Sequence, residues 1–309
     1  MAGSVEALYR ARIRSAPPLA TEIRAVDPDL VLVGNSMLGA NVDKALFDAE
    51  LSRRAGHPVR TFFCPVDGVH APVFAVVTFD HLARAGLKGV PVGYVSQGVT
   101  SFLVTTARGR DPQRVKEYLV RGNDAFFRKY RDPSLKRRLA LRPLSRAYYD
   151  SPEASRKVVH SAVDWVYKRF HHGESAFFLM KARFSGLVFD PEVAAPSPLP
   201  LRPENSFIPD EAAALPGSPL FLVSSHPNYL KTKSTRSSEE KREAALSEWR
   251  NIARDLRPYG CAVLDMDAHR ELDDPALFLD NVHFTAEGRA LNSRLLADDI
   301  FENGLYRTR

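Results

Sequence analysis

Three residues of the types used in nucleophilic catalysis stand near opposite ends of the chain. Ser36 comes directly after an apolar run and a glycine, while Asp280 and His283 stand three positions apart before the last helical pattern. A serine hydroxyl is a weak nucleophile at neutral pH and needs a neighbouring base. A histidine would take its proton, and an aspartate would hold the imidazole in the required tautomer. Serine also caps many helices, so the alternative for Ser36 is an ordinary turn.

Short apolar runs alternate with helical patterns around these residues. The alternation predicts an α/β fold built on a doubly wound parallel sheet, a three-layer arrangement like that of flavodoxin. In such a sheet, functional groups gather beyond the carboxyl ends of the strands, and polar residues follow each run here. The predicted strands lie in 30–33, 61–66, 90–95, 219–224 and 261–264, and the predicted helices in 42–54, 71–85, 237–256 and 287–301.

The α/β pattern is interrupted in its middle. Residues 111–172 show charged helical patterns with aromatic residues at helical spacing, and residues 187–217 contain several prolines. This pattern indicates a small helical subdomain or, alternatively, a lid whose basic and aromatic inner face holds a substrate. The predicted parts are an N-terminal helical segment (1–27), an α/β core (28–110 and 218–309) and a mostly helical insertion with a proline-rich linker (111–217).

The two ends of the predicted core resemble the SGNH/GDSL hydrolase superfamily. The tripeptide Gly-Asn-Ser that ends at Ser36 resembles the first motif block, and Asp280-x-x-His283 resembles the last. The resemblance implies that Ser36 is the nucleophile and that His283 and Asp280 complete its triad. It also implies an oxyanion hole formed by the N–H of Ser36 and by Gly68, which corresponds to the glycine of the second block.

The sequence also departs from that family pattern. Asn35 stands where the family usually has aspartate, and the third block with its oxyanion-hole asparagine is absent. Gln97, after the third predicted strand, is expected to replace that asparagine, with Asn228 as a second substitute. We also expect Asn35 and Asn228 to contact the substrate. These departures and the insertion resemble a divergent branch whose members take part in acylation or deacylation of bacterial surface polysaccharides.

The expected function is that of a serine ester hydrolase or O-acyltransferase that needs no cofactor. The resemblance implies a small ester or an O-acylated carbohydrate as substrate. The alternative is a non-catalytic SGNH-like module that binds an anionic polymer or a partner protein through the basic insertion. The pattern Asp265-x-Asp267-x-His269 would place three metal ligands on one face of a strand. No further ligand cluster accompanies it, so we favour a structural role and expect no metal.

Composition and charge limit which other classes of protein the chain could belong to. Among 309 residues, 44% are hydrophobic and 26% charged, which is typical of a globular protein. No apolar signal core or membrane span is evident, so the sequence as it stands predicts a cytoplasmic protein. Membrane association, with a periplasmic or cell-surface location, is expected only if an anchor has been removed. The net charge of +6 permits an anionic partner, but a solvated arginine-rich surface explains it and no nucleic acid is expected. Cys64 and Cys261 are predicted to be buried thiols.

Overall fold

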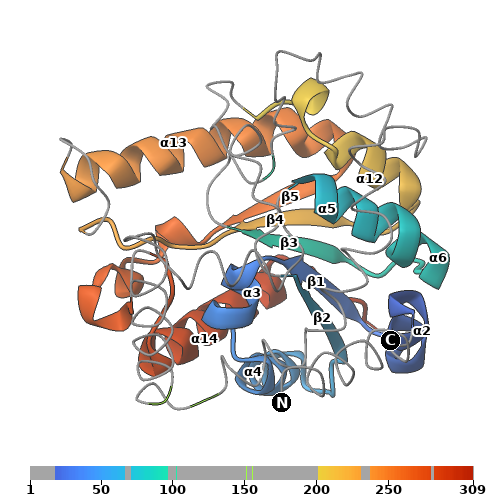
Figure 1. Ribbon diagram of the computed structural model, residues 1–309, viewed down its shortest axis with the longest axis horizontal. Helices are drawn as coiled ribbons and strands as arrows, with labels where there is room; N and C mark the ends of the chain where they lie inside the picture. Colours follow the sequence, from blue (N-terminus) through green and yellow to red (C-terminus); the bar gives the residue numbers. More distant parts are fainter. Residues whose placement is uncertain are drawn as a thin grey trace, which may run out of the picture.

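One parallel β-sheet lies between two layers of helices (Figure 1). The computed structural model describes residues 18–66, 71–96, 102, 151, 155, 201–230, 237–279 and 282–308. The α/β class predicted from the alternation of runs and helical patterns is therefore confirmed. The arrangement of helices on both sides of the sheet agrees with a three-layer fold.

The sheet has five strands, and each strand is parallel to its neighbours. Their order, β2-β1-β3-β4-β5, is one of the common doubly wound orders, and the direction of winding switches between β1 and β3. Each strand lies within a predicted apolar run or extends one residue beyond it. The strands are β1 (Leu30–Gly34), β2 (Thr61–Pro65), β3 (Val92–Ser96), β4 (Leu220–Ser224) and β5 (Cys261–Asp265).

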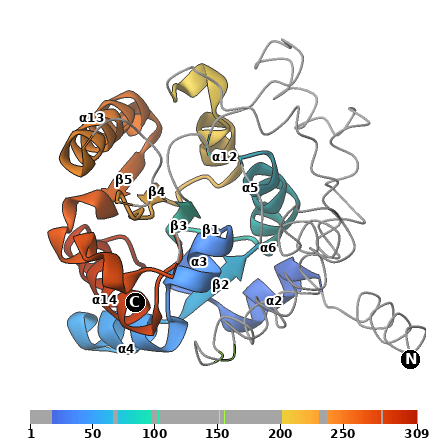
Figure 2. The ribbon, with the colours of Figure 1, turned by 60° about the vertical axis from the view of Figure 1, so that its left-hand side comes forward.

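Helices cover both faces of the sheet (Figure 2). One face carries α2 (Leu19–Val26), α5 (Ala71–Val77), the π-helix η1 (Thr78–Leu82), α6 (Ala83–Ala85), α12 (Ile208–Ala214) and α13 (Ser238–Leu256). The other face carries α3 (Ser36–Asn41), α4 (Lys44–Ala55) and α14 (Ala286–Glu302). Short 3₁₀ turns lie in the connections: η4 (Pro203–Asn205), η5 (Arg257–Tyr259), η6 (Met266–Ala268), η7 (Arg270–Asp273) and η8 (Pro275–Leu277).

Alternate side chains of each strand enter two hydrophobic cores. In β1, Val31 and Val33 pack in the core on the α13 side, whereas Leu30 and Leu32 pack in the core on the α14 side. Strands covered on both faces are apolar throughout, which is why the sequence shows continuous runs rather than alternation. Burying one such side chain fully stabilises the fold by about 1.5–3 kcal/mol. Both cysteines are buried and free, as predicted.

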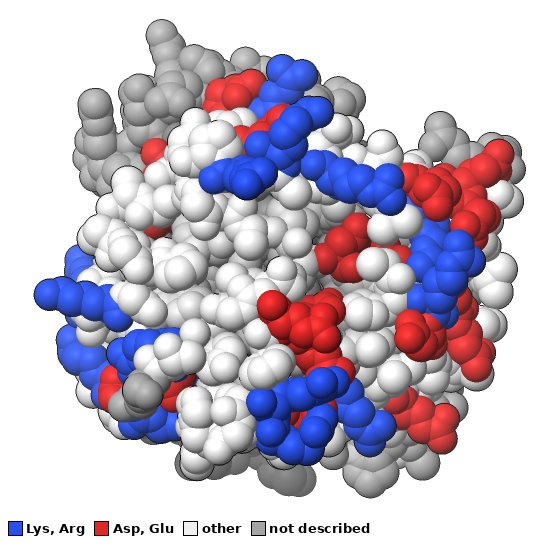
Figure 3. All heavy atoms as spheres, turned by 180° about the vertical axis from the view of Figure 1, so that it is seen from behind, with Lys and Arg blue, Asp and Glu red and all other residues white. Residues whose placement is uncertain are grey.

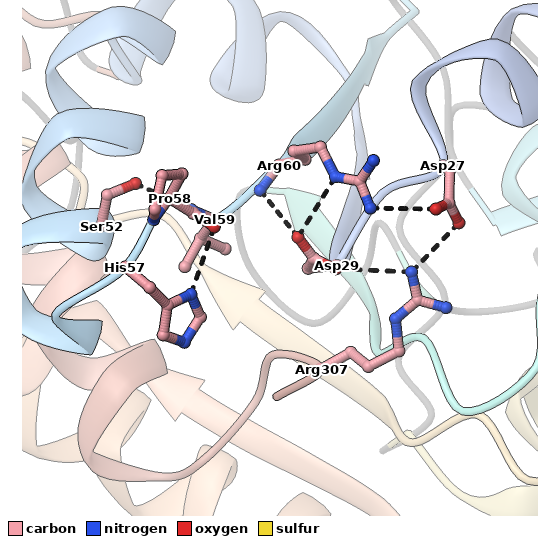
Figure 4. A network of polar contacts seen from close by, with 8 residues as sticks. All are labelled: Asp27, Asp29, Ser52, His57, Pro58, Val59, Arg60 and Arg307. Atoms are coloured by element: carbon pink, nitrogen blue, oxygen red, sulfur yellow. Dashed lines mark hydrogen bonds and ion pairs between the residues drawn. The ribbon is translucent and has the colours of Figure 1, made fainter. Parts of the chain in front are cut away.

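A network of ion pairs joins three chain segments at the amino edge of the sheet (Figure 4). Asp29, only 1% exposed, precedes β1 and accepts the main-chain N–H of Arg60 at 2.9 Å. Arg307, beyond α14, lies with its guanidinium between Asp27 and Asp29, at 3.1 and 3.4 Å. The side chain of Arg60 contacts the same two carboxylates. The network therefore fastens the C-terminal segment to the starts of β1 and β2, at the edge opposite Ser36.

Two features near the ends of the described ranges concern the predicted domain boundaries. Helix α2 begins directly after Pro18 and lies inside the segment predicted to be helical, residues 1–27. The end of the predicted linker, residues 201–217, forms η4 and α12 and contributes Phe207 and Ile208 to the core on the α13 side. The first 17 residues of that segment and the helical insertion at 111–172 lie outside the described residues, apart from isolated positions in the insertion.

Candidate active site

Ser36 stands at a tight turn from β1 into α3. Gly34 ends the strand where α3 folds back across β1 and β3. A Cβ atom at position 34 would lie 2.5 Å from Cβ of Leu38 and 2.7 Å from the carbonyl oxygen of Val95. No side chain fits there without moving the main chain of β3 or the helix. Glycine at position 34 therefore allows Ser36 to be the first residue of α3, at the carboxyl edge of the sheet.

Asn35 fixes this turn with both ends of its amide. Its Oδ1 caps α3 by accepting the N–H of Met37 at 2.9 Å, and its Nδ2 donates to Oγ of Ser96 at 2.6 Å. Ser96 is the last residue of β3, so the second bond crosses the switch point between β1 and β3. These contacts give Asn35 a clear structural task. Its expected contact with substrate stays a prediction.

Ser36 and His283 lie side by side although 247 positions separate them. Nε2 of His283 is 3.4 Å from Oγ of Ser36, and Ser36 is 8% exposed while His283 is half-buried. Before substrate binds, contacts between a nucleophile and its base are often as long as this one. The arrangement lets the imidazole accept the serine proton. Asp280, the expected third member of the triad, lies outside the described residues.

The loop that carries His283 is closed by main-chain contacts. Phe278 and Phe284 form an antiparallel bridge, and the N–H of Leu279 donates to the carbonyl of His283 at 2.8 Å. Thr285 then caps α14, because its Oγ1 accepts the N–H of Gly288 at 3.2 Å. The position of His283 is therefore fixed by a short bridge on one side and by a capped helix on the other.

The residues Asp265, Asp267 and His269 do not lie on one strand. Strand β5 ends at Asp265, and the chain turns into η6, so the alternation expected of a strand stops before Asp267. No set of three histidine, cysteine or acidic side chains in the described ranges is arranged to hold a metal ion. Each of the three has a different partner: Asp265 with Ser224 at 2.9 Å, Asp267 with His226 at 3.1 Å, and His269 with Asp299 at 2.8 Å.

A second histidine, His226, lies in a cluster of charged side chains beyond β4. The ring is 1% exposed, with Nδ1 3.1 Å from Asp267 and Nε2 3.3 Å from Asp273. Neither contact has the geometry of an aligned hydrogen bond. Arg242, from α13, pairs with Asp273 at 2.6 Å. The ring of Phe278 lies 6.1 Å from that of His226, which places this cluster against the loop of His283.

Burial and like charge alter two ionisable groups beside this cluster. Burial, helped by the neighbouring charge of Asp267, raises the pKa of Asp265 to about 6, against hydrogen bonds from Ser224 and from the main chain of Asp267 that lower it. Burial also raises the pKa of Tyr229 far above its ordinary value, with Asp267 adding to the effect. Tyr229 therefore stays neutral. Asp265 is a carboxyl group that titrates only a little below neutral pH.

The remaining predicted site residues are partly outside the described ranges. Gly68 and Gln97, expected in the oxyanion hole, lie in segments that the structure does not describe. Asn228 is described and buried, and its Oδ1 accepts the N–H of Leu230 at 3.2 Å within the loop after β4. That contact turns part of its amide toward its own loop. A role for Asn228 in binding substrate stays a prediction.

Two residues near the site were given no role from the sequence, although His226 was noted there as one of the polar residues that follow the fourth predicted strand. Asn41, at the end of α3, contacts the main chain on both sides of His283. His226 follows β4, as several polar residues follow other strands, but its position gave no sign of two carboxylate partners. The position of His226 just after a strand was the only sign in the sequence that it lies near the site. For Asn41 no pattern signals a contact with a loop about 240 positions away.

Comparison with known proteins adds no family assignment: no protein-family model matches the chain, and no curated protein matches it. Within the described ranges, every helix is too short or too polar to span a membrane.

Figure 3 shows basic and acidic side chains interspersed on the face seen from behind. The basic insertion expected to attract an anionic polymer lies outside the described residues.

Proposed function

We propose that this protein is a serine ester hydrolase or O-acyltransferase of the SGNH type. The observation that carries the proposal is the 3.4 Å contact between Nε2 of His283 and Oγ of Ser36. A strand-to-helix turn presents the serine at the switch point of a doubly wound sheet, where ligands bind in such folds. The base, His283, lies in the loop before the last helix, α14. Nucleophile and base within reach of each other are the basic requirement of covalent acyl transfer.

The reaction proceeds in two halves. His283 takes the hydroxyl proton of Ser36 as Oγ bonds to the carbonyl carbon of an ester. The tetrahedral intermediate then expels the alcohol, which leaves with the proton held by His283, and an acyl-enzyme remains. Water or a sugar hydroxyl next gives a proton to His283 and attacks the acyl carbon. The bond from that carbon to Oγ breaks, and the proton returns to Ser36.

We assign the developing oxyanion to two main-chain donors, the N–H of Ser36 and the N–H of Gly68. The side-chain amide of Gln97 is the third donor, in place of the missing asparagine. Losing one donor of this kind typically costs about 10²–10³-fold in turnover. Asp280 is assigned to the other ring nitrogen of His283. The proposed substrate class is an O-acylated carbohydrate or a similar small ester, and this rests on the resemblance of the motif blocks alone.

Hydrolysis of a short-chain aryl acetate tests the proposal. We expect turnover by the wild type and a loss of at least about 10³-fold in Ser36→Ala, since the nucleophile is removed. Ser52→Ala is the matched control, because its hydroxyl only accepts the N–H of Val59 at 3.0 Å on the far end of α4. This control should keep wild-type turnover.

The outcomes separate the two functions considered from the sequence. Turnover that persists in Ser36→Ala would contradict the proposal. If the wild type neither hydrolyses the ester nor reacts at Ser36 with a fluorophosphonate, the proposal also fails, and the non-catalytic binding module becomes the better account. If the activity depends on Ser36, adding free sugars as acceptors then separates a hydrolase from a transferase.

A further inference from the structure

The side chain of Asn41 joins the helix of Ser36 to the loop of His283. Asn41 is the last residue of α3 and is 1% exposed. Its Nδ2 donates to the carbonyl of Val282 at 2.7 Å, and its Oδ1 accepts the N–H of Phe284 at 3.0 Å. These are the two neighbours of His283 in the chain. One amide group therefore holds the main chain on both sides of the proposed base.

Asn41 is itself held from two other elements. Its Nδ2 also donates to Oγ of Ser225, beyond β4, at 3.1 Å. Its own carbonyl accepts a hydrogen bond from Nδ2 of Asn292, in α14, at 2.8 Å. An amide offers two donors and an acceptor in one plane, which is what a contact with both a carbonyl and an N–H requires. The position is thus tied to α3, to the end of β4 and to α14 together.

We propose that Asn41 is a positioning residue that sets the distance between Oγ of Ser36 and Nε2 of His283. The inference rests on the proposed function, and it concerns how that site is assembled. A displacement of about 1 Å in a catalytic contact can cost about 10²-fold in rate. The contact is already long at 3.4 Å, so a loop released from Asn41 leaves the base out of reach in much of the population.

Truncation of Asn41 should therefore slow acylation without weakening substrate binding. In Asn41→Ala we expect kcat for an aryl acetate to fall by about 10–100-fold with KM nearly unchanged. Fluorophosphonate labelling of Ser36 should slow by a similar factor. Asn41→Leu keeps most of the volume, removes the same hydrogen bonds, and should show the same loss if the alanine variant is too unstable to purify.

The matched control is a second buried asparagine. Asn205 is 5% exposed and accepts the N–H of Arg202 at 2.7 Å, next to residues of the core on the opposite face of the sheet. Asn205→Ala removes a buried amide of the same kind and should lower the free energy of unfolding. Its labelling rate at Ser36 should match that of the wild type, because nothing near His283 changes.

A double-mutant cycle separates positioning from a general structural effect. If Asn41 acts through His283, adding Asn41→Ala to His283→Ala should slow labelling of Ser36 by less than about 3-fold. An equal loss in both backgrounds would overturn the inference, as would wild-type kcat in folded Asn41→Ala. A wild type that is never labelled at Ser36 refutes the proposed function, and the positioning role with it. A labelled wild type with an equally labelled Asn41→Ala refutes the positioning role alone.

Discussion

Replacing Asp265 with asparagine should stabilise the protein at neutral pH but not at acid pH. Burial and the nearby charge of Asp267 raise the pKa of Asp265 from 3.8 to about 6. The folded state therefore binds this proton more tightly than the unfolded state does. Because the unfolded chain releases the proton first, the wild type loses stability as the pH rises from about 4 to about 6, and the loss is complete above that range. Asparagine cannot ionise and avoids the loss.

The size of the gain follows from the same pKa change. A rise from 3.8 to about 6 corresponds to at most about 3 kcal/mol, at about 1.4 kcal/mol for each pH unit. Asp265 is only partly buried, and solvent screening reduces this ceiling to about 1–2 kcal/mol. The asparagine Oδ1 can still accept the hydrogen bonds from Ser224 and from the N–H of Asp267, which now both reach one carboxylate oxygen. The substitution therefore removes charge while keeping these contacts.

Urea unfolding at pH 4 and pH 7.5 measures the effect through tryptophan fluorescence, to which buried Trp249 contributes. Asp265→Asn should raise the midpoint at pH 7.5, leave it unchanged at pH 4, and keep the slope with urea constant. Asp299→Asn is the matched control and should not raise the midpoint, because it removes a carboxylate that is paired with His269. An equal gain at both pH values, or a loss at pH 7.5 in Asp265→Asn, would refute the reasoning.

Three further substitutions test other parts of the structure. Gly34→Ala should lower the free energy of unfolding by about 1–3 kcal/mol and slow the reaction of Ser36. Thermal unfolding measures the first effect and fluorophosphonate labelling the second. A variant as stable and as reactive as the wild type would contradict the close packing of β1, β3 and α3. The hydrogen bond to Asp299 raises the pKa of His269, so its stabilisation is complete below pH 6.5 and is lost as the pH rises through the raised value. His269→Ala should therefore lower the urea midpoint more at pH 6 than at pH 9. Asp29→Ala should lower the free energy of unfolding by about 1–3 kcal/mol, seen as a lower melting temperature. The rate of fluorophosphonate labelling of Ser36, at the opposite edge, should not change; an altered rate would show that the two edges are coupled.

The sheet could be predicted because its strands are buried on both faces. Continuous apolar runs such as 30–33 then mark the strands directly, and the helical patterns between them require parallel pairing. The helix predicted over 71–85 shows where this reasoning stops. A π-helix interrupts it at Thr78–Leu82, and Oγ1 of Thr78 contacts both the carbonyl of Phe74 and the hydroxyl of Tyr94 in β3. That contact depends on tertiary packing, which the local pattern does not contain.

A rule of topology places Ser36 and His283 at the same edge of the sheet, whereas their pairing was expected from the resemblance of the motif blocks. The carboxyl ends of parallel strands lie at one edge, so residues that follow different strands converge there. The side chains that fix the geometry depend on the path of individual loops. Asn41 meets Val282 across 241 positions of sequence, and Asp267 turns toward His226 because the chain leaves β5 for η6. The periodicity of apolar residues along the chain predicts neither contact.

Reaction of Ser36 with a fluorophosphonate, followed by peptide mass spectrometry, tests whether Ser36 and His283 act as nucleophile and base. The reagent reacts fast with a serine whose proton is accepted by a nearby base. We expect one adduct on the Ser36 peptide of the wild type, a rate at least about 10²-fold lower in His283→Ala, and no adduct on that peptide in Ser36→Ala. An unlabelled wild type, or labelling at the same rate without His283, would contradict the assignment of Ser36 and His283 as nucleophile and base.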